Sequence, residues 1–296
     1  MTKTRYYFFA FIITILLFLF SCTLNTDDGS TTSYAVIVGI NDYLNSQVND
    51  LNWCVNDAEG IKQALIDAGW DENNITLLVD DNGSTNATKN NILNALSGMI
   101  QKADADDFIL FYYSGHGTQV TDQNGDEADG IDEAIVPVDF DGNSASLILD
   151  DELGELFSQS KTQKGVFIFD SCFSGGFINK ETTGGDYRVK GISIYPVNLK
   201  STQPISGDLD VYNIPVLTAS AQDKVSSESA TLQHGVFTYW ILEGLSDNNA
   251  DYNGDGYITV REIFKFAETY TKESTGGAQT PEIQEPQFFT YILITH

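Results

Sequence analysis

The chain has 296 residues, of which 42% are hydrophobic and 19% charged; it can bury a large core, and this composition excludes general disorder. Its 42 acidic and 15 basic residues give a formal net charge of -27 at pH 7, which repels a polyanion and argues against nucleic acid as a partner. The same surplus suits divalent cations or a cationic substrate, provided that carboxylates converge on particular points.

The N-terminal residues form a segment separate from the fold. A positively charged start precedes the apolar run 6–20, which is shorter than the roughly 20 residues of a spanning helix. The run ends in Ser-Cys and resembles the lipobox of bacterial lipoproteins, which implies a signal peptide over 1–21 and lipidation of Cys22. An uncleaved anchor and an ordinary signal peptide are the alternatives. We expect 22–33 to be a polar tether to a membrane of the bacterial cell envelope, with the outer membrane or the surface favoured.

From residue 34 onward, apolar runs typical of strands alternate with helical patterns. The strand candidates are 34–40, 75–79, 108–113, 166–169 and 214–219, and the helix candidates are 54–68, 89–101, a segment ending near 245, and 260–270. Continuous apolar runs are typical of strands inside a parallel sheet that is covered on both faces. The alternation predicts an α/β fold with an open, mostly parallel central sheet and helices on both faces, in one domain over 34–296.

Two polar stretches interrupt this alternation. The first, 118–151, is strongly acidic, and the second, 176–212, carries several glycines and basic residues. We expect both to be long loops, which in a compact domain are usually functional or disordered.

Two of the apolar strands run directly into glycine-bearing motifs with a reactive side chain. The strand 108–113 is followed by Ser-Gly-His116-Gly, and 166–169 by Asp-Ser-Cys172. The carboxyl ends of parallel strands meet at one edge of a sheet, so we expect the two motifs to meet. A neighbouring imidazole makes a thiol a good nucleophile, although a His or a buried Cys taken alone is more often structural.

The segments 111–117 and 170–175 resemble the two catalytic motifs of caspase-like cysteine peptidases of the C14 type, most closely metacaspases and their bacterial relatives. The resemblance covers nearly all of 34–294, and the Asp-Ser-Cys order favours metacaspases over true caspases. It implies a caspase-like fold and cysteine endopeptidase activity, with Cys172 as nucleophile and His116 as general base. The N–H groups of Gly117 and Cys172 would form the oxyanion hole.

The resemblance also implies a pocket for the residue before the cut bond. The positions that line it in metacaspases are matched by Cys54, Asp57, Ser114 and Asp170. Paired carboxylates favour Arg or Lys in the substrate and argue against Asp. A helix N-terminal charge is the alternative for Asp57. A disulfide between Cys54 and Cys172 is possible in an exported protein, but it would consume the nucleophile.

Calcium ions are the cofactor that we expect, at two places. Asp132, Asp150 and Asp151 match the calcium-binding carboxylates of calcium-activated metacaspases, with Asn179 at the fourth position, where an amide lowers the charge. The alternative is a solvated acidic loop.

The second place, 251–262, follows the EF-hand spacing independently of any family. Its oxygen ligands would be Asp251, Asn253, Asp255, Tyr257 through its carbonyl, Thr259 and Glu262. The sixth position is glycine. The gap to the preceding helix is longer than in a standard EF-hand, so a polar turn is the alternative.

Together these features predict a membrane-tethered, calcium-binding cysteine endopeptidase that cuts protein or peptide substrates after Arg or Lys. A non-catalytic calcium-binding surface module on the same scaffold is the competing interpretation. The basic residues Arg188 and Lys190 in the stretch 176–212 fit the predicted pocket, so we expect self-cleavage there; an ordinary surface loop is the alternative.

Overall fold

The computed structural model of the protein describes residues 31–80, 86–125, 130–172, 186–192, 214–221, 224–284 and 292–295. Residues 31–296 form one compact unit. The predicted signal peptide, Cys22 and Asn179 lie outside the described residues. Within the described part, no helix has the length and apolar character needed to cross a membrane.

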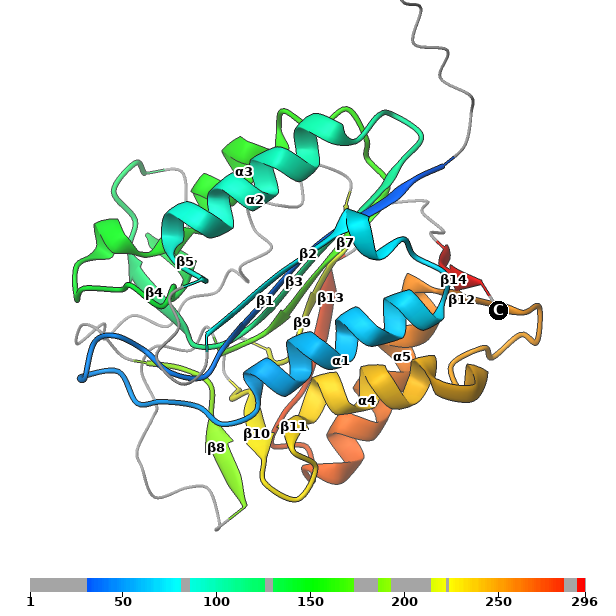
Figure 1. Ribbon diagram of the computed structural model, residues 1–296. Helices are drawn as coiled ribbons and strands as arrows, with labels where there is room; N and C mark the ends of the chain where they lie inside the picture. Colours follow the sequence, from blue (N-terminus) through cyan, green and yellow to red (C-terminus); the bar gives the residue numbers. More distant parts are fainter. Residues whose placement is uncertain are drawn as a thin grey trace, which may run out of the picture. The chain divides into compact units, whose positions relative to one another are not determined.

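The core of the unit 31–296 is a six-stranded sheet in the order β13-β9-β7-β3-β1-β2 (Figure 1). The strands are β1 (Ser33–Ile40), β2 (Ile75–Asp80), β3 (Phe108–Ser114), β7 (Gly165–Asp170), β9 (Val216–Thr218) and β13 (Glu282–Gln284). All neighbours are parallel except β13, which runs antiparallel to β9. Every residue of β3 and β7 is buried, as their continuous apolar runs predict.

Helices cover both faces of this sheet, which confirms the predicted fold class. The helices α2 (Lys89–Lys102) and α3 (Asp150–Phe157) lie on one face, and α1 (Cys54–Asp67), α4 (Val236–Leu245) and α5 (Val260–Ser274) on the other (Figure 1). Alternate residues of β1 serve the two layers: Val36 and Val38 pack with the α2 and α3 side, whereas Ala35 and Ile37 pack with the α1, α4 and α5 side.

The acidic stretch 118–151 is not one long loop, and that expectation was wrong. It contains β5 (Ile131–Ile135) and β6 (Ile148–Leu149), which form an antiparallel three-stranded sheet with β4 (Gly117–Thr121). Val120, Ala134, Ile135 and Ile148 are buried in the core on the α2 side, and this tertiary packing outweighs the polar composition.

Two further small sheets complete the described part. β8 (Tyr187–Val189), β10 (Ser227–Ser229) and β11 (His234–Gly235) form one, and β12 (Tyr257–Thr259) pairs with β14 (Ile292–Thr295) in the other. Short 3-10 turns occur at Glu72–Asn74, Ser144–Ser146 and Ser246–Asn248.

The start of α1 is fixed against the end of β1. The side chain of Asn41, just after β1, accepts hydrogen bonds from the amides of Cys54 (2.9 Å) and Val55 (3.2 Å). Gly39 allows this approach, because a Cβ there would collide with the Cys54 carbonyl. The first turn of α1, with Asp57, is thereby held at the carboxyl edge of the sheet.

Candidate active site

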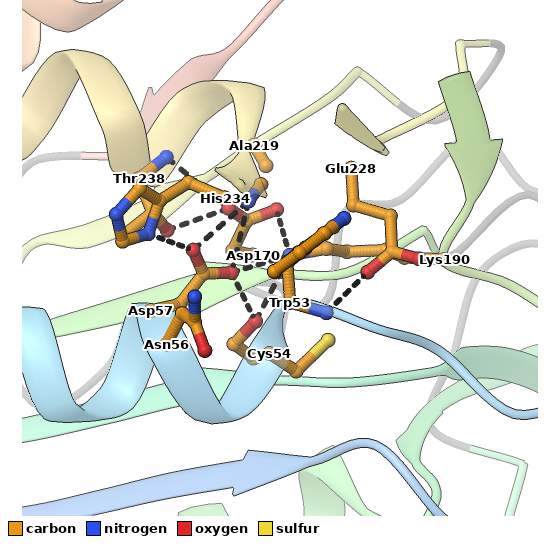
Figure 2. Close-up of polar contacts among 12 residues, drawn as sticks. Trp53, Cys54, Asn56, Asp57, Asp170, Lys190, Ala219, Glu228, His234 and Thr238 are labelled. Carbon is orange, nitrogen blue, oxygen red and sulfur yellow. Dashed lines mark hydrogen bonds and ion pairs between the residues drawn. The ribbon is translucent and has the colours of Figure 1, made fainter. Parts of the chain in front are cut away.

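The two motifs that follow β3 and β7 meet at the carboxyl edge of the sheet. Ser114, the last residue of β3, pairs in register with Asp170, the last residue of β7. His116 and Cys172 each follow two residues later. Asp57, in the first turn of α1, faces the same place (Figure 2).

An acidic pocket at this edge holds the side chain of Lys190. The Lys190 Nζ lies 2.8 Å from Asp57 Oδ2, 3.2 Å from Asp170 Oδ1 and 2.9 Å from Ser114 Oγ (Figure 2). All three charged side chains are 0% exposed. Burial alone lowers the pKa of Lys190, but Asp170 and Asp57 raise it well above its ordinary value.

Asp57 is held by several hydrogen bonds as well as by the cation. It accepts from Ser114 Oγ (2.7 Å) and the Gly235 amide (2.9 Å), and its Oδ1 lies 2.9 Å from His234 Nδ1. Burial alone raises the pKa of Asp57, but Lys190 and His234 outweigh it and hold the pKa below its ordinary value. The carboxylate is therefore charged and fixed in position.

Asp170 has its own set of donors. Ser226 Oγ donates to Oδ1 (2.8 Å), and Thr238 Oγ1 donates to Oδ2 (2.6 Å). A Cβ on Gly235 would collide with both Asp170 Oδ2 and Lys190 Nζ, so glycine there leaves room for a cationic side chain. Removing one member of such a buried set would leave the remaining charges without their partners, which is strongly destabilising.

The backbone of Lys190 occupies the predicted oxyanion hole. Its carbonyl accepts hydrogen bonds from the amides of Cys172 (2.9 Å) and Gly117 (3.2 Å), and its amide donates to the Ser226 carbonyl (3.0 Å). Preorganised N–H donors at this distance are what a developing oxyanion requires. The two amides predicted from the sequence thus converge on one carbonyl oxygen.

The residues around Lys190 continue across the site in an extended form. β8 pairs antiparallel with β10, and on the other side Gly191 bridges to Gly117, whose carbonyl accepts from the Ile192 amide (3.1 Å). The segment 187–192 therefore crosses the site as a bound peptide would, with the Lys190–Gly191 bond at its centre.

The Cys172 thiol is buried against Ser226, whose carbonyl accepts from the Lys190 amide. Its Sγ donates to the Ser226 carbonyl (3.0 Å) and accepts from the Ser226 amide (2.7 Å), and no hydrogen bond joins it to His116 among the described residues. Burial raises the pKa of Cys172 to about 12, so the sulfur is a neutral thiol here.

His116 is also neutral in this arrangement. Its Nε2 lies 2.6 Å from the Asn49 carbonyl, which can only accept, so Nε2 carries the proton and Nδ1 keeps its lone pair. Burial lowers the pKa of His116 to about 4. Tyr43 fixes the residue, since its hydroxyl accepts from the His116 amide (2.8 Å) and its ring lies 5.1 Å from the imidazole.

Cys54 is the first residue of α1 and lies next to the pocket (Figure 2). Both Cys54 and Cys172 are buried free thiols, so the alternative of a disulfide between them is not realised. Burial raises the pKa of Cys54, which therefore contributes packing and not charge to the pocket wall.

The predicted family-type calcium residues lie on β5 and α3. Asp132 and Asp150 are buried, and Asp151 Oδ2 accepts from the Asn124 side chain (2.8 Å). Across the residues that the structure describes, no three His, Cys, Asp or Glu side chains come together in a group that could hold a metal.

In the loop 251–262 the oxygen atoms bind the loop itself. Asp251 accepts from the amides of Gly254 (2.7 Å) and Gly256 (2.9 Å), and Glu262 accepts from the Thr259 amide (3.0 Å) and hydroxyl (2.8 Å) as the capping box of α5. Gly256 has a φ of 83°, the left-handed conformation for which the sixth position of an EF-hand keeps glycine.

Sequence reasoning missed four residues that build the pocket region: Ser226, Glu228, His234 and Thr238. The sequence predicts a helix ending near 245 but does not assign His234 or Thr238, around the start of that helix, to the pocket. Ser226 and Glu228 stand in a polar stretch with no motif, so only the tertiary structure brings them to the site.

Comparison with known proteins identifies the class. A family model described as the metacaspase, peptidase C14 domain matches residues 34–181, half of the chain. The chain belongs to the metacaspase family.

Individual relatives agree with this assignment. Metacaspase-1 of Schizosaccharomyces pombe is 31% identical over 80% of this chain and 60% of its own length, and Metacaspase-4 of Arabidopsis thaliana is 39% identical over 50% and 35%. The chain thus spans between about a third and three fifths of these relatives. A crystal structure of a Geobacter sulfurreducens protein matches the fold, with a TM-score of 0.58 and 21% identity over 88% of this chain and 93% of that one.

Proposed function

We propose that this protein is a cysteine endopeptidase that cuts polypeptides after Lys or Arg, with Cys172 as nucleophile and His116 as general base. One observation carries the proposal: Lys190 has its ammonium between Asp57 and Asp170 while its carbonyl accepts from the Gly117 and Cys172 amides. A side chain in a specificity pocket and a carbonyl in an oxyanion hole are the two requirements of a bound substrate residue.

The chemistry follows from the positions of these groups. Cys172 Sγ turns from Ser226, gives its proton to His116 Nδ1 and attacks the carbonyl carbon, whose oxygen becomes an oxyanion held by the amides of Gly117 and Cys172. Each such donor is worth about 3 kcal/mol in the transition state. His116 then protonates the leaving amine, and water hydrolyses the thioester. Both groups rest in neutral form, so proton transfer accompanies the attack.

The charge of the pocket supports a cation and opposes an anion. Two buried carboxylates face one ammonium, and its three N–H groups match the three acceptors at Asp57, Asp170 and Ser114. A carboxylate in the same place would meet two like charges without water to screen them.

Fluorogenic peptides that differ only in the residue before the cut test this function. We expect turnover with Lys or Arg, at least a hundredfold lower kcat/KM with the uncharged norleucine, and none with Asp. Cys172→Ala is the matched inactive control. A preference for Asp would refute the pocket assignment, and binding without turnover would favour the non-catalytic scaffold.

The segment 187–192 is proposed as an internal substrate. Lys190 lies between Asp57 and Asp170, whereas the Arg188 side chain is half exposed and contacts Glu228, so the cut falls after Lys190 and not after Arg188. Incubation of the full chain should give one new N-terminus at Gly191 by mass spectrometry, absent from Cys172→Ala. A cut after Arg188 alone, or an intact chain with full peptidase activity, would contradict this.

Calcium binding and membrane attachment are also parts of the proposal. The loop 251–262 offers carboxylate, amide, hydroxyl and carbonyl oxygens around a glycine of positive φ, a donor set that suits Ca²⁺. The acidic residues Asp132, Asp150 and Asp151 are the candidate for a second site. We propose lipid attachment at Cys22, which labelling with a radioactive fatty acid, and its loss in Cys22→Ala, would test.

A further inference from the structure

The strand that delivers Lys190 to the acidic pocket carries a second cation, Arg188, two residues before it. We propose that Glu228 forms a second specificity subsite that selects Arg at the third residue before the cut, so that the enzyme recognises Arg-x-Lys or Arg-x-Arg in polypeptides. The inference rests on the proposed peptidase function and extends its substrate class from one basic residue to a spaced pair.

The register of the strands sets the spacing. In the pairing of β8 with β10, Arg188 lies directly opposite Glu228, and Val189 opposite Ser227. Side chains alternate along a strand, so Arg188 and Lys190 lie on one face and Val189 on the other. Directly opposite side chains on one face of an antiparallel pair interact. A substrate that takes the place of β8 on β10 would present the third residue before its cut to Glu228.

The Glu228 carboxylate is fixed and almost fully buried. Its side chain is 1% exposed, and its oxygens accept from the amides of Asn52 (3.0 Å) and Trp53 (2.8 Å), just before α1 (Figure 2). Those contacts hold the carboxylate in one orientation toward β8, with Arg188 Nε 3.8 Å from Oε1. An anion held in place before the substrate arrives loses little entropy on binding.

The geometry favours Arg over Lys at this position. Arg188 reaches two acceptors at once: its Nε faces Glu228, and its Nη1 donates to the Asp50 carbonyl at 2.8 Å. A guanidinium presents several N–H groups in a rigid planar fork, whereas an ammonium is a point charge that cannot span both acceptors in the same way. The side chain of Arg188 remains 53% exposed, so solvent weakens the contact.

Three peptides with the same fluorophore test the subsite: Arg-Val-Lys, Lys-Val-Lys and Ala-Val-Lys. For the wild-type chain we expect kcat/KM to be about five- to tenfold higher for Arg-Val-Lys than for Ala-Val-Lys, with Lys-Val-Lys in between. In Glu228→Gln the ratio should fall to within twofold. The ratio cancels any general loss of activity that arises because Glu228 also holds Asn52 and Trp53.

The matched control is Glu59→Gln, which removes the same charge from an exposed position of α1. The control should keep the wild-type ratio, which separates a local subsite from the general attraction of an acidic protein for cations. A wild-type ratio near one, or a full ratio retained in Glu228→Gln, would overturn the subsite.

A second measurement does not depend on turnover. In Cys172→Ala, hydrogen exchange of the amides 187–190 should be about fivefold faster after Glu228→Gln and no faster when Arg188→Gln is added. Additive effects of the two changes would overturn the contact. A chain that shows this coupling but cuts none of the peptides would refute the proposed function and leave the binding subsite standing.

Discussion

The acidic pocket and the loop 251–262 are both rich in carboxylates, but their side chains point to different kinds of partner. In the pocket, Asp57 and Asp170 come from α1 and β7, far apart in the chain, and both face one cation. In the loop, Asp251 and Glu262 accept from amides within their own short segment.

The difference shows what convergence requires. The carboxylates of a short loop can accept hydrogen bonds from the backbone N–H groups of the same loop. The loop 251–262 therefore has the full EF-hand spacing, but its structure does not require a bound ion. Carboxylates buried at 0% exposure have no such freedom, and leaving one of them without a partner would be costly. The pocket is therefore built for a cation, whereas the loop is compatible with one.

We expect the largest effect from removing the two proposed catalytic side chains beside the pocket, a change that does not involve the loop 251–262. Cys172→Ala should lower kcat by at least about 10⁴-fold, and His116→Ala by a comparable factor, because the two act as a unit. Steady-state kinetics on a Lys peptide measures both. The double variant should be no worse than either single one; full additivity would contradict a shared step.

The next largest effect tests the role of the two carboxylates in the pocket. Asp170→Asn keeps the shape but leaves one carboxylate for the substrate ammonium, so kcat/KM for Lys peptides should fall by about 10²- to 10³-fold, the cost of breaking a buried pair. Glu59→Gln is the control for the change in net charge. Relative to wild type, Asp170→Asn should lose much less on a norleucine peptide; an equal loss on both would mean that Asp170 is only structural.

The sequence predicted most of the sheet, since continuous apolar runs and their glycine-bearing ends carry the signal for β3 and β7. By way of the family motifs it also singled out Asp57, Ser114 and Asp170, which the structure places around one ammonium group. It did not predict the strands β5 and β6, whose acidic neighbours mask short apolar runs that become strands only through packing on the core. Nor did it indicate Ser226 or Glu228, because their roles depend on pairing with segments about 40 to 180 residues away.

The buried base His116 should make the free energy of unfolding depend on pH. The pH range of this effect should differ from that of the exposed loop 251–262. The folded pKa of His116 is lowered to about 4 from an ordinary 6.5, so the unfolded chain binds a proton first as the pH falls. The free energy of unfolding should drop by up to about 3 kcal/mol between pH 6.5 and 4. The amides of Gly256 and Gly254 lower the pKa of Asp251. Protonation of Asp251 should therefore change the free energy of unfolding only at lower pH.

Urea denaturation of Cys172→Ala across this range measures the drop without self-cleavage. The matched variant Cys172→Ala with His116→Gln should have a flatter profile over pH 6.5 to 4.5. Identical slopes for the two chains would show that His116 is not the group responsible.

The smallest effect tests whether the loop 251–262 becomes a metal site when calcium is supplied. Calcium that binds only the folded chain, at a concentration a hundred times its dissociation constant, would add about 2.7 kcal/mol to the free energy of unfolding. The loop must give up hydrogen bonds such as those from Thr259 to Glu262 when it binds calcium. We therefore expect a gain of about 1 to 2 kcal/mol. Melting curves of Cys172→Ala with calcium or a chelator measure this gain. Glu262→Gln should lose most of it, whereas Glu273→Gln, an exposed change of the same charge on the same helix, should keep it.

Calorimetric titration then separates the two acidic regions, because uptake that survives in Glu262→Gln must come from elsewhere, with Asp132 and Asp150 as the first candidates. No uptake at millimolar calcium in the parent chain would leave the loop as a polar turn that satisfies itself.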